Sequence, residues 1–255
     1  MTVKRYYSLV LVLGALTALA PFSIDTYLPG FPAIAKSFGT DTGRVTLSLS
    51  SFFLGIALGQ LVYGPLLDKF GRKKPLYAGL VIYLAATAGC YFSLNLEALI
   101  AFRFVQALGG CAAGIAAMAM VRDIFPVEEN AKIFSLLVLV LGASPMIAPT
   151  IGSFITAAFG WRAIFIALFV LAIIILIATY TILPEPGHVQ KSQSLTAKNI
   201  AKNYWQVMKV PQFKIYAIGG GIALSGLFAY LASSPAIFME GYGVSNHAYG
   251  LIFAA

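Results

Sequence analysis

The chain has 255 residues, of which 60% are hydrophobic and 10% are charged, and its mean hydropathy is +0.87. Soluble globular domains carry about 25% charged residues, so this composition excludes one and indicates an all-α polytopic membrane protein. The formal net charge of +8 would suit a nucleic-acid-binding protein, but the 17 Lys and Arg residues stand mostly in short gaps between apolar runs. That distribution is typical of topology signals, and we expect no nucleic acid as partner.

Seven apolar runs are long enough to cross a bilayer, because about 20 helical residues span its core of roughly 30 Å. An eighth run opens at Tyr249, and the sequence ends in the middle of it, which suggests the front part of a longer protein. The seven predicted spans are residues 6–29, 45–67, 75–96, 98–121, 133–158, 163–184 and 213–238.

Loop charges predict a cytoplasmic N-terminus. With this orientation thirteen Lys and Arg residues fall on the cytoplasmic side, whereas Lys36, Arg44 and Arg162 fall outside and Arg103 lies within a span. Cytoplasmic loops collect Lys and Arg. The first run has span length and no small-residue cleavage site, so we expect a retained helix and no cleaved signal peptide.

The first predicted span contains an acidic residue near its outer end. Asp25 follows a run without charges from Tyr6 to Ile24. A charge at mid-bilayer costs about 2.5 to 3.5 kcal/mol on insertion scales, so Asp25 is expected to face a water-filled cavity or a cation. Arg103, the one cation within a predicted span, lies at a matching depth. Alternatively, Asp25 is a structural residue near the membrane edge that helps to end the helix before Pro29.

The second and fifth predicted spans are rich in small residues and proline, which allow helices to approach closely. Corresponding positions in two groups of three helices would indicate an inverted repeat. Alternatively, Gly and Pro are simply common in membrane helices. The residues are Gly55, Gly59 and Gly64 in the second span and Gly142, Pro145, Pro149 and Gly152 in the fifth.

The loop after the second span, GPLLDKFGRKKPL, predicts a charged latch. Asp68 stands at a helix end that favours cations, so it needs a basic partner. Arg72 can form a fork to a carboxylate, and Asp123 lies on the same side of the membrane. Alternatively, the four cations only set topology. The predicted latch consists of Gly64, Asp68, Gly71, Arg72, Lys73 and Asp123.

One long polar stretch divides the sequence into three parts. Residues 1–184 form a six-helix transmembrane bundle, 185–212 a basic cytoplasmic linker, and 213–255 the start of a second bundle with helix seven and part of helix eight. The linker segment LTAKNIAKNYWQVMK could form a basic amphipathic helix on the inner leaflet.

The loop GPLLDKFGRKK resembles the signature of the major facilitator superfamily. The segments SIDTYLPGFPAIAKSFG, LGIALGQLVYGPLLDKFGRK, RFVQALGG, VRDIFP and APTIGSF, followed by WRAIF, are similar to the bicyclomycin-resistance (Bcr/CflA) branch of its drug:proton antiporters. The resemblance implies twelve helices in two bundles, of which this chain would supply the first bundle, the linker and about a helix and a half. It departs from the family's fifth-helix pattern at Ala148 and Ser153, where glycines are usual.

The resemblance also implies a function. The protein would be a monomeric, non-enzymatic exporter of drugs or other small lipophilic compounds in a bacterial inner membrane. It would work by alternating access, with the proton gradient as energy source and no cofactor or metal. Asp25 and Arg103 would couple protons to drug binding. Apolar and aromatic residues would line the cavity, although each could instead face lipid or pack on a neighbour; the candidates are Tyr27, Phe52, Phe53, Gln60, Gln106, Phe228 and Tyr230.

Other functions stay open. A uniporter or symporter of the same fold could carry a sugar or metabolite. A seven-helix receptor is disfavoured, because such proteins place the N-terminus outside and the seventh span has no central lysine. A truncated chain could also be inactive, since half of a central cavity would be missing. Neither a metal-ligand spacing nor a Walker loop occurs in the sequence, so we do not expect ATP-driven pumping.

Overall fold

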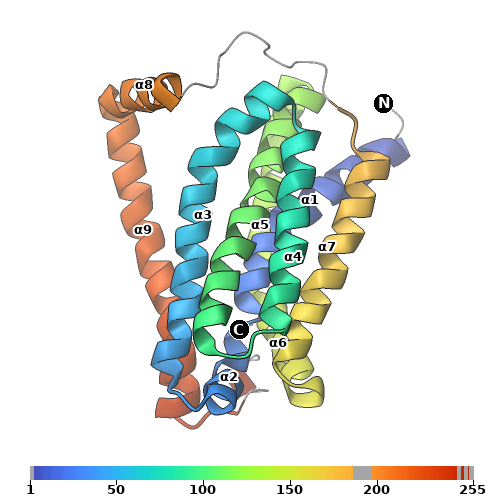
Figure 1. Ribbon diagram of the computed structural model, residues 1–255. Helices are drawn as coiled ribbons and strands as arrows, with labels where there is room; N and C mark the ends of the chain where they lie inside the picture. Colours follow the sequence, from blue (N-terminus) through green and yellow to red (C-terminus); the bar gives the residue numbers. More distant parts are fainter. Residues whose placement is uncertain (1–2, 186–196, 246–247, 250–251, 253–255) are drawn as a thin grey trace.

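The computed structural model describes residues 3–185, 197–245, 248–249 and 252, and helices dominate it, as predicted (Figure 1). The predicted eighth span and the middle of the predicted linker lie mostly outside the described residues. The helices are α1 Val3–Asp25, the 3₁₀ turn η1 Leu28–Gly30, α2 Phe31–Phe38, α3 Thr42–Phe70, α4 Lys73–Tyr91, α5 Leu96–Ile124, α6 Val127–Phe159, α7 Arg162–Ile182, α8 Ala197–Lys209, α9 Pro211–Pro235 and the π-helical η2 Ala236–Gly241.

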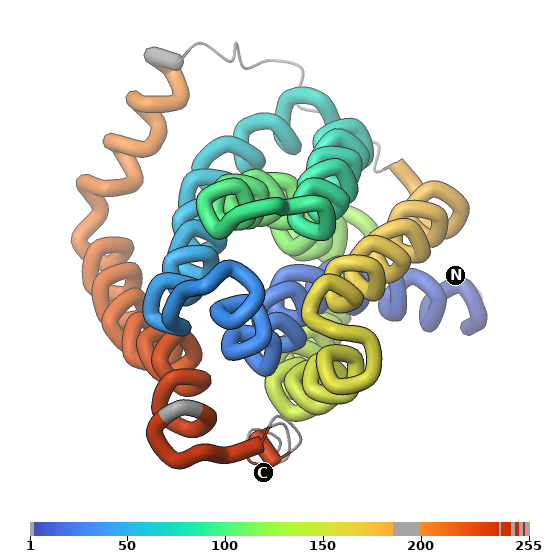
Figure 2. Tube along the Cα trace, turned by 60° about the horizontal axis from the view of Figure 1, so that its bottom comes forward, coloured from blue at the N-terminus to red at the C-terminus, as the bar shows by residue number. Residues whose placement is uncertain are grey.

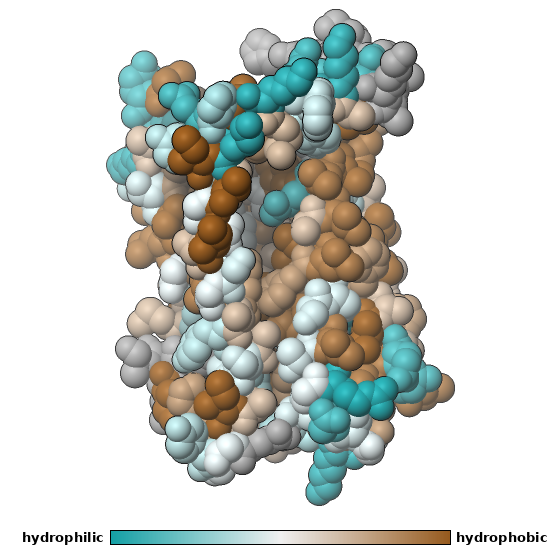
Figure 3. Space-filling view, turned by 90° about the vertical axis from the view of Figure 1, so that its left-hand side faces the viewer, coloured by the Kyte–Doolittle hydropathy of each residue, from teal (hydrophilic) through white to brown (hydrophobic). Residues whose placement is uncertain are grey.

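Six described stretches are long and apolar enough to cross a membrane: Val3–Phe38, Thr42–Phe70, Leu96–Ile124, Val127–Phe159, Arg162–Ile182 and Pro211–Met239. The third predicted span forms α4, which is not among the six. Its first turn carries Lys73, Lys74 and Pro75, which lower its mean hydropathy. Figure 3 shows the distribution of hydropathy on one face of the molecule, where hydrophilic side chains gather at the two ends and apolar ones lie between them.

The first seven helices pack as a bundle with α1 and α5 at its centre (Figures 1 and 2). The main contacts join α3 with α5, α4 with α5, α1 with α6, α4 with α7, and α1 with α5 and α7. Exchanging α1 with α5, α3 with α6 and α4 with α7 maps this set of contacts onto itself. Such a pairing is what an inverted three-plus-three repeat produces.

Glycines bring the central helices into close contact. A Cβ on Gly55 or Gly59 of α3 would collide with α5, as the spacing of small residues predicted. Gly79 of α4 and Gly109 of α5 face each other in the same way, and sequence reasoning missed them. Gly64 differs, because its nearest neighbour is the Tyr204 hydroxyl of α8, 3.9 Å from a Cβ built there.

Two hydrophobic clusters fill the bundle. The first surrounds the beginning of α1, with Leu9 and Leu16 among its buried residues. The second surrounds the end of α1 and α2, with Tyr27 and Phe31. Ser23 lies between them along α1 and is also buried. The junction of the two clusters therefore holds polar side chains that apolar packing shields from water.

Helix α9 stands apart from this bundle (Figure 2). It is exposed along most of its length. The end of α9 contacts the beginning of α3, where Thr46 Oγ1 donates to the Ala232 carbonyl at 3.5 Å. The stretch of the predicted linker that the structure describes contains the predicted amphipathic helix as α8.

Candidate functional site

Asp25 is the last residue of α1. The helix was predicted to run to residue 29, and this is wrong, because it ends at Asp25 and the chain turns through η1 into α2. Pro29 explains the break: without an N–H it cannot satisfy the Asp25 carbonyl by an α-helical hydrogen bond. Thr26 holds the turn, since its Oγ1 donates to the Phe22 carbonyl at 2.6 Å. The break fits the structural reading of Asp25, but the residue does not lie at an exposed edge.

The Asp25 side chain is buried, with 2% of the residue exposed. Ser144 of α6 donates to its Oδ2 at 3.3 Å, and within the described part of the chain this is its one hydrogen bond. A helix C-terminus disfavours an anion, and so does burial. The carboxylate is therefore weakly compensated as an anion, and its charge will depend on access to water.

Arg103 is completely buried in α5 and stacks between two aromatic rings. Its guanidinium carbon lies 4.4 Å from the Tyr27 ring centroid and 4.1 Å from that of Phe52. Its Nη1 donates to Gln106 Oε1 at 2.7 Å and its Nη2 to the Ser23 carbonyl at 3.0 Å. Among the described residues, its Nε has no hydrogen-bond partner. A desolvated cation is thus held by rings and neutral acceptors.

Asp25 and Arg103 do not pair in this conformation. The three ion pairs among the described residues join Arg44 to Glu97, and Arg72 to Asp68 and to Asp123. Arg103 nevertheless reaches α1 at Ser23, two residues before the acid. The two buried charges therefore lie on adjoining segments, and each is bound by neutral groups.

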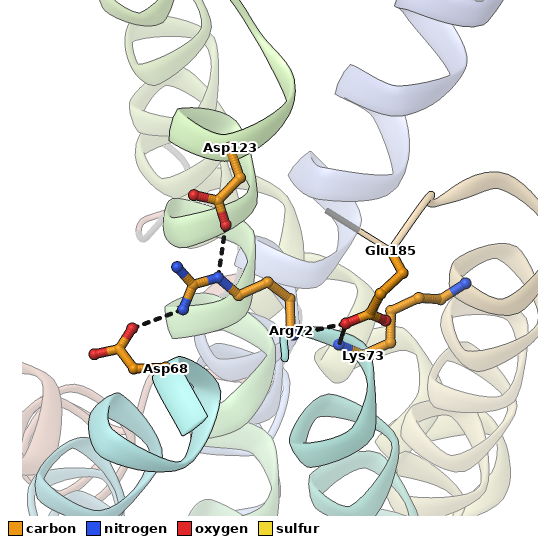
Figure 4. A network of polar contacts seen from close by, with 5 residues as sticks. All are labelled: Asp68, Arg72, Lys73, Asp123 and Glu185. Atoms are coloured by element: carbon orange, nitrogen blue, oxygen red, sulfur yellow. Dashed lines mark hydrogen bonds and ion pairs between the residues drawn. The ribbon is translucent and has the colours of Figure 1, made fainter. Parts of the chain in front are cut away.

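The predicted pair between Arg72 and Asp123 forms (Figure 4), at the end of the bundle where α1 begins (Figure 1). Arg72 Nε donates to Asp123 Oδ2 at 2.6 Å, and its Nη1 donates to Asp68 Oδ1 at 2.8 Å. Gly71 precedes it with φ +83°, a conformation that favours glycine. Partial burial lowers the pKa of the Arg72 guanidinium, but its bonds to the two carboxylates outweigh this and raise the pKa above its ordinary value.

The two carboxylates of the latch should contribute differently to the stability of the protein. The Asp123 side chain is 17% exposed and that of Asp68 is 70% exposed. We expect Asp123→Asn to lower the free energy of unfolding by about 2 kcal/mol, in the range of buried hydrogen bonds to charged groups. Asp68→Asn should cost less than about 1 kcal/mol, as exposed pairs do. Denaturant titrations of both variants in detergent measure this, and equal losses would contradict the order.

Helix α6 packs on the break that follows Asp25. Gly152 lies against the Thr26 backbone so closely that a Cβ would collide with the Thr26 carbonyl. Gly142, by contrast, has nothing within 4 Å of a Cβ. Pro145 and Pro149 both lie inside α6, one and five residues after Ser144. The small-residue pattern therefore positions the helix that binds Asp25, although only one of its two glycines makes a close contact.

Gly152→Ala should separate α6 from α1. We expect it to lower the free energy of unfolding by about 1 to 3 kcal/mol, as overpacking does. Gly142→Ala is the matched control, and it should be neutral or stabilise the helix by up to about 1 kcal/mol. Unfolding of both variants in detergent gives the comparison. A Gly152→Ala protein as stable as the control would show that the contact relaxes freely.

The cavity candidates divide into groups. Tyr27, Phe52 and Gln106 are fully buried around Arg103. The Phe53 and Phe228 rings lie tilted against each other with centroids 4.5 Å apart and join α3 to α9. The two remaining candidates, Gln60 and Tyr230, are exposed.

Sequence reasoning missed the hydroxyl groups of the buried network. Ser23 bonds to the Tyr83 hydroxyl at 2.7 Å, and Gln106 Nε2 donates to Thr87 Oγ1 at 2.8 Å. Ser144 was missed as well. Serine and threonine are frequent in membrane helices, where they can bond to their own backbone. Their type and spacing alone therefore gave no signal.

A family model described as Major Facilitator Superfamily matches residues 13–255. Among curated proteins, the chain is 33% identical over 254 residues to an uncharacterised MFS-type transporter, YdgK, of Bacillus subtilis, covering 99% of this chain and 63% of the relative. It is 32% identical to a bicyclomycin resistance protein homolog of Haemophilus influenzae, covering 98% and 63%. It is 30% identical to a chloramphenicol resistance protein of Pseudomonas aeruginosa, covering 96% and 58%. The chain thus spans about three fifths of the length of these relatives.

Solved structures share the fold. A bacterial homolog of the human lysosomal transporter Spinster, in an inward-facing conformation, aligns with a TM-score of 0.77 at 16% identity, covering 99% of this chain and 59% of that one. A D-xylose–proton symporter aligns with a TM-score of 0.72 at 18% identity, covering 98% and 65%.

Proposed function

Because the chain belongs to the Major Facilitator Superfamily, we propose that the protein is a proton-coupled exporter of small lipophilic compounds that works by alternating access. The observation that carries this proposal is Asp25, buried at a helix break with a single serine as hydrogen-bond donor. The names of two relatives, which refer to bicyclomycin and chloramphenicol resistance, support drugs as substrates.

Asp25 is the proton carrier in this proposal. An acid at a helix break can gain and lose contact with water when the neighbouring helix moves, and its charge changes with that contact. It takes up a proton when the site opens outward and releases it when the site opens inward. Substrate binding competes with protonation. Arg103 supplies a fixed positive charge that favours release of the proton, without being locked in an ion pair.

The latch holds the ends of α3 and α5 together in the conformation described here. Arg72 joins Asp68 at the end of α3 to Asp123 at the end of α5. Breaking these pairs is the local change that lets the helix ends separate. In this proposal the latch and the N-terminus lie on the cytoplasmic side of a bacterial inner membrane. The protein acts as a monomer without a cofactor.

Efflux from loaded cells tests the function. Cells expressing the complete reading frame are loaded with ethidium, a lipophilic cation, and energised with glucose. We expect faster loss of ethidium than from cells without the protein, and loss of this difference when a protonophore collapses the gradient. The same cells without ethidium are tested for uptake of labelled xylose. Uptake of the sugar without efflux of ethidium would favour the alternative, a symporter or uniporter for sugars.

A further inference from the structure

The segment just after α7 contacts the beginning of α4 in both directions, and Figure 4 shows one of them, from Glu185 to the backbone amides of Arg72 and Lys73. Glu185 Oε1 accepts hydrogen bonds from the backbone amides of Arg72 at 3.0 Å and Lys73 at 3.5 Å. In the opposite direction, Lys73 Nζ donates to the Leu183 carbonyl at 2.7 Å. The Glu185 carboxylate, just after α7, thus accepts from the first backbone amides of α4. In return, a lysine of α4 donates to a carbonyl just after α7.

These contacts have a clear physical basis. The first amides of a helix lack partners and carry a partial positive charge, and the last carbonyls carry a negative one. Arg72 stands at the N-cap of α4 and makes no side-chain cap of its own. At the other end, Leu183 is extended, with φ −75° and ψ 129°, as the following Pro184 favours. Glu185 therefore supplies the cap that α4 lacks, and Pro184 directs the chain toward it.

Arg72 is consequently fixed from two directions. Its side chain is bound by Asp123 and Asp68, and its backbone by Glu185. Glu185 is also the first residue of the predicted linker between the two bundles. It joins that segment to the residue on which both ion pairs of the latch depend.

We propose that Glu185 is a positioning residue of the latch: it fixes the Arg72 backbone so that the guanidinium reaches Asp123 and Asp68, and it transmits movement of the linker to these ion pairs. The second half of this statement rests on the proposed transport function. The first half concerns local geometry, and an experiment without substrate tests it.

Hydrogen–deuterium exchange of the purified full-length protein tests the geometry. In Glu185→Ala, the amides of Arg72 and Lys73 should exchange about fivefold faster, the change expected when an N-cap of ordinary strength is lost. Glu185→Gln keeps an acceptor oxygen and should restore part of the protection. Glu97→Ala is the matched control, because Glu97 is also an exposed glutamate whose side chain meets an arginine. Unchanged exchange at Arg72 and Lys73 in Glu185→Ala would overturn the proposal.

A double-mutant cycle on ethidium efflux tests the coupling. Glu185→Ala should slow efflux about fivefold in the wild-type background and have little further effect when Asp123→Asn has already broken the buried pair. Equal slowing in both backgrounds would mean that Glu185 acts independently of the latch, which contradicts the proposal. If the unmodified protein exports nothing, the transport function fails, while the exchange experiment still decides the role of Glu185.

Discussion

Asp25→Asn should reduce proton-driven efflux of ethidium to the level of cells that lack the protein. Asparagine has nearly the same shape, and its carbonyl oxygen can still accept the hydrogen bond from Ser144, so the α1–α6 contact should survive. It cannot bind or release a proton in the physiological range. The exchange cycle then loses its coupling step, although drug could still equilibrate across the membrane down its own gradient.

Two controls separate coupling from folding. Asp41→Asn changes an acid at the N-cap of α3, whose Oδ1 accepts from the Arg44 amide at 2.9 Å, and it should leave efflux near the wild-type rate. Ser144→Ala removes the hydrogen bond but keeps the titratable acid, so efflux should continue. Undiminished proton-driven efflux in Asp25→Asn would exclude this residue as the proton carrier.

Arg103→Met should abolish efflux without destabilising the protein. Burying a charge that lacks a counter-ion costs several kcal/mol, and contacts with Tyr27 and Phe52 return about 2 kcal/mol when desolvated. Methionine fills much of the same space without a charge. We therefore expect the free energy of unfolding of Arg103→Met to lie within about 1 kcal/mol of the wild-type value or above it. Efflux should be lost, because the variant lacks the internal positive charge.

Arg103→Ala is the informative companion variant. It removes the same charge but leaves a cavity between the two rings, so it should lose about 3 kcal/mol of stability as well as transport. Denaturant titrations in detergent and ethidium efflux provide the two readouts. If Arg103→Met is as unstable as Arg103→Ala, the guanidinium is needed for folding. If it exports at the wild-type rate, Arg103 has no part in coupling.

Much of the fold could be predicted because membrane spans need long apolar runs. Seven runs were identified, and each contains a helix, including α4, which is not among the six stretches apolar enough to cross a membrane. The end of α1 was misplaced by four residues, because hydropathy reports which residues are buried and not where a hydrogen-bond ladder breaks. Pro29 carried that information, since without an N–H it cannot donate the α-helical hydrogen bond to the carbonyl of Asp25.

The candidate site was predictable only in its charged members. A charge in an apolar run is costly, so Asp25 and Arg103 were conspicuous, and Arg72 with Asp123 followed from complementary charge on one side of the membrane. Ser144 and Glu185 could not be predicted as site residues, because their roles depend on which helices contact each other. Contacts between α6 and α1 and between α7 and α4 join residues more than 100 positions apart. A local sequence pattern does not predict contacts between residues so far apart in the chain.

Proton release on drug binding tests the central claim most directly. Purified full-length protein in weakly buffered detergent solution is mixed with ethidium, and the pH of the solution is followed. The wild type should release protons in proportion to the ethidium bound, and Asp25→Asn should bind ethidium and release none. Equal proton release by both proteins would show that another group carries the proton, and the account given for Asp25 would be wrong.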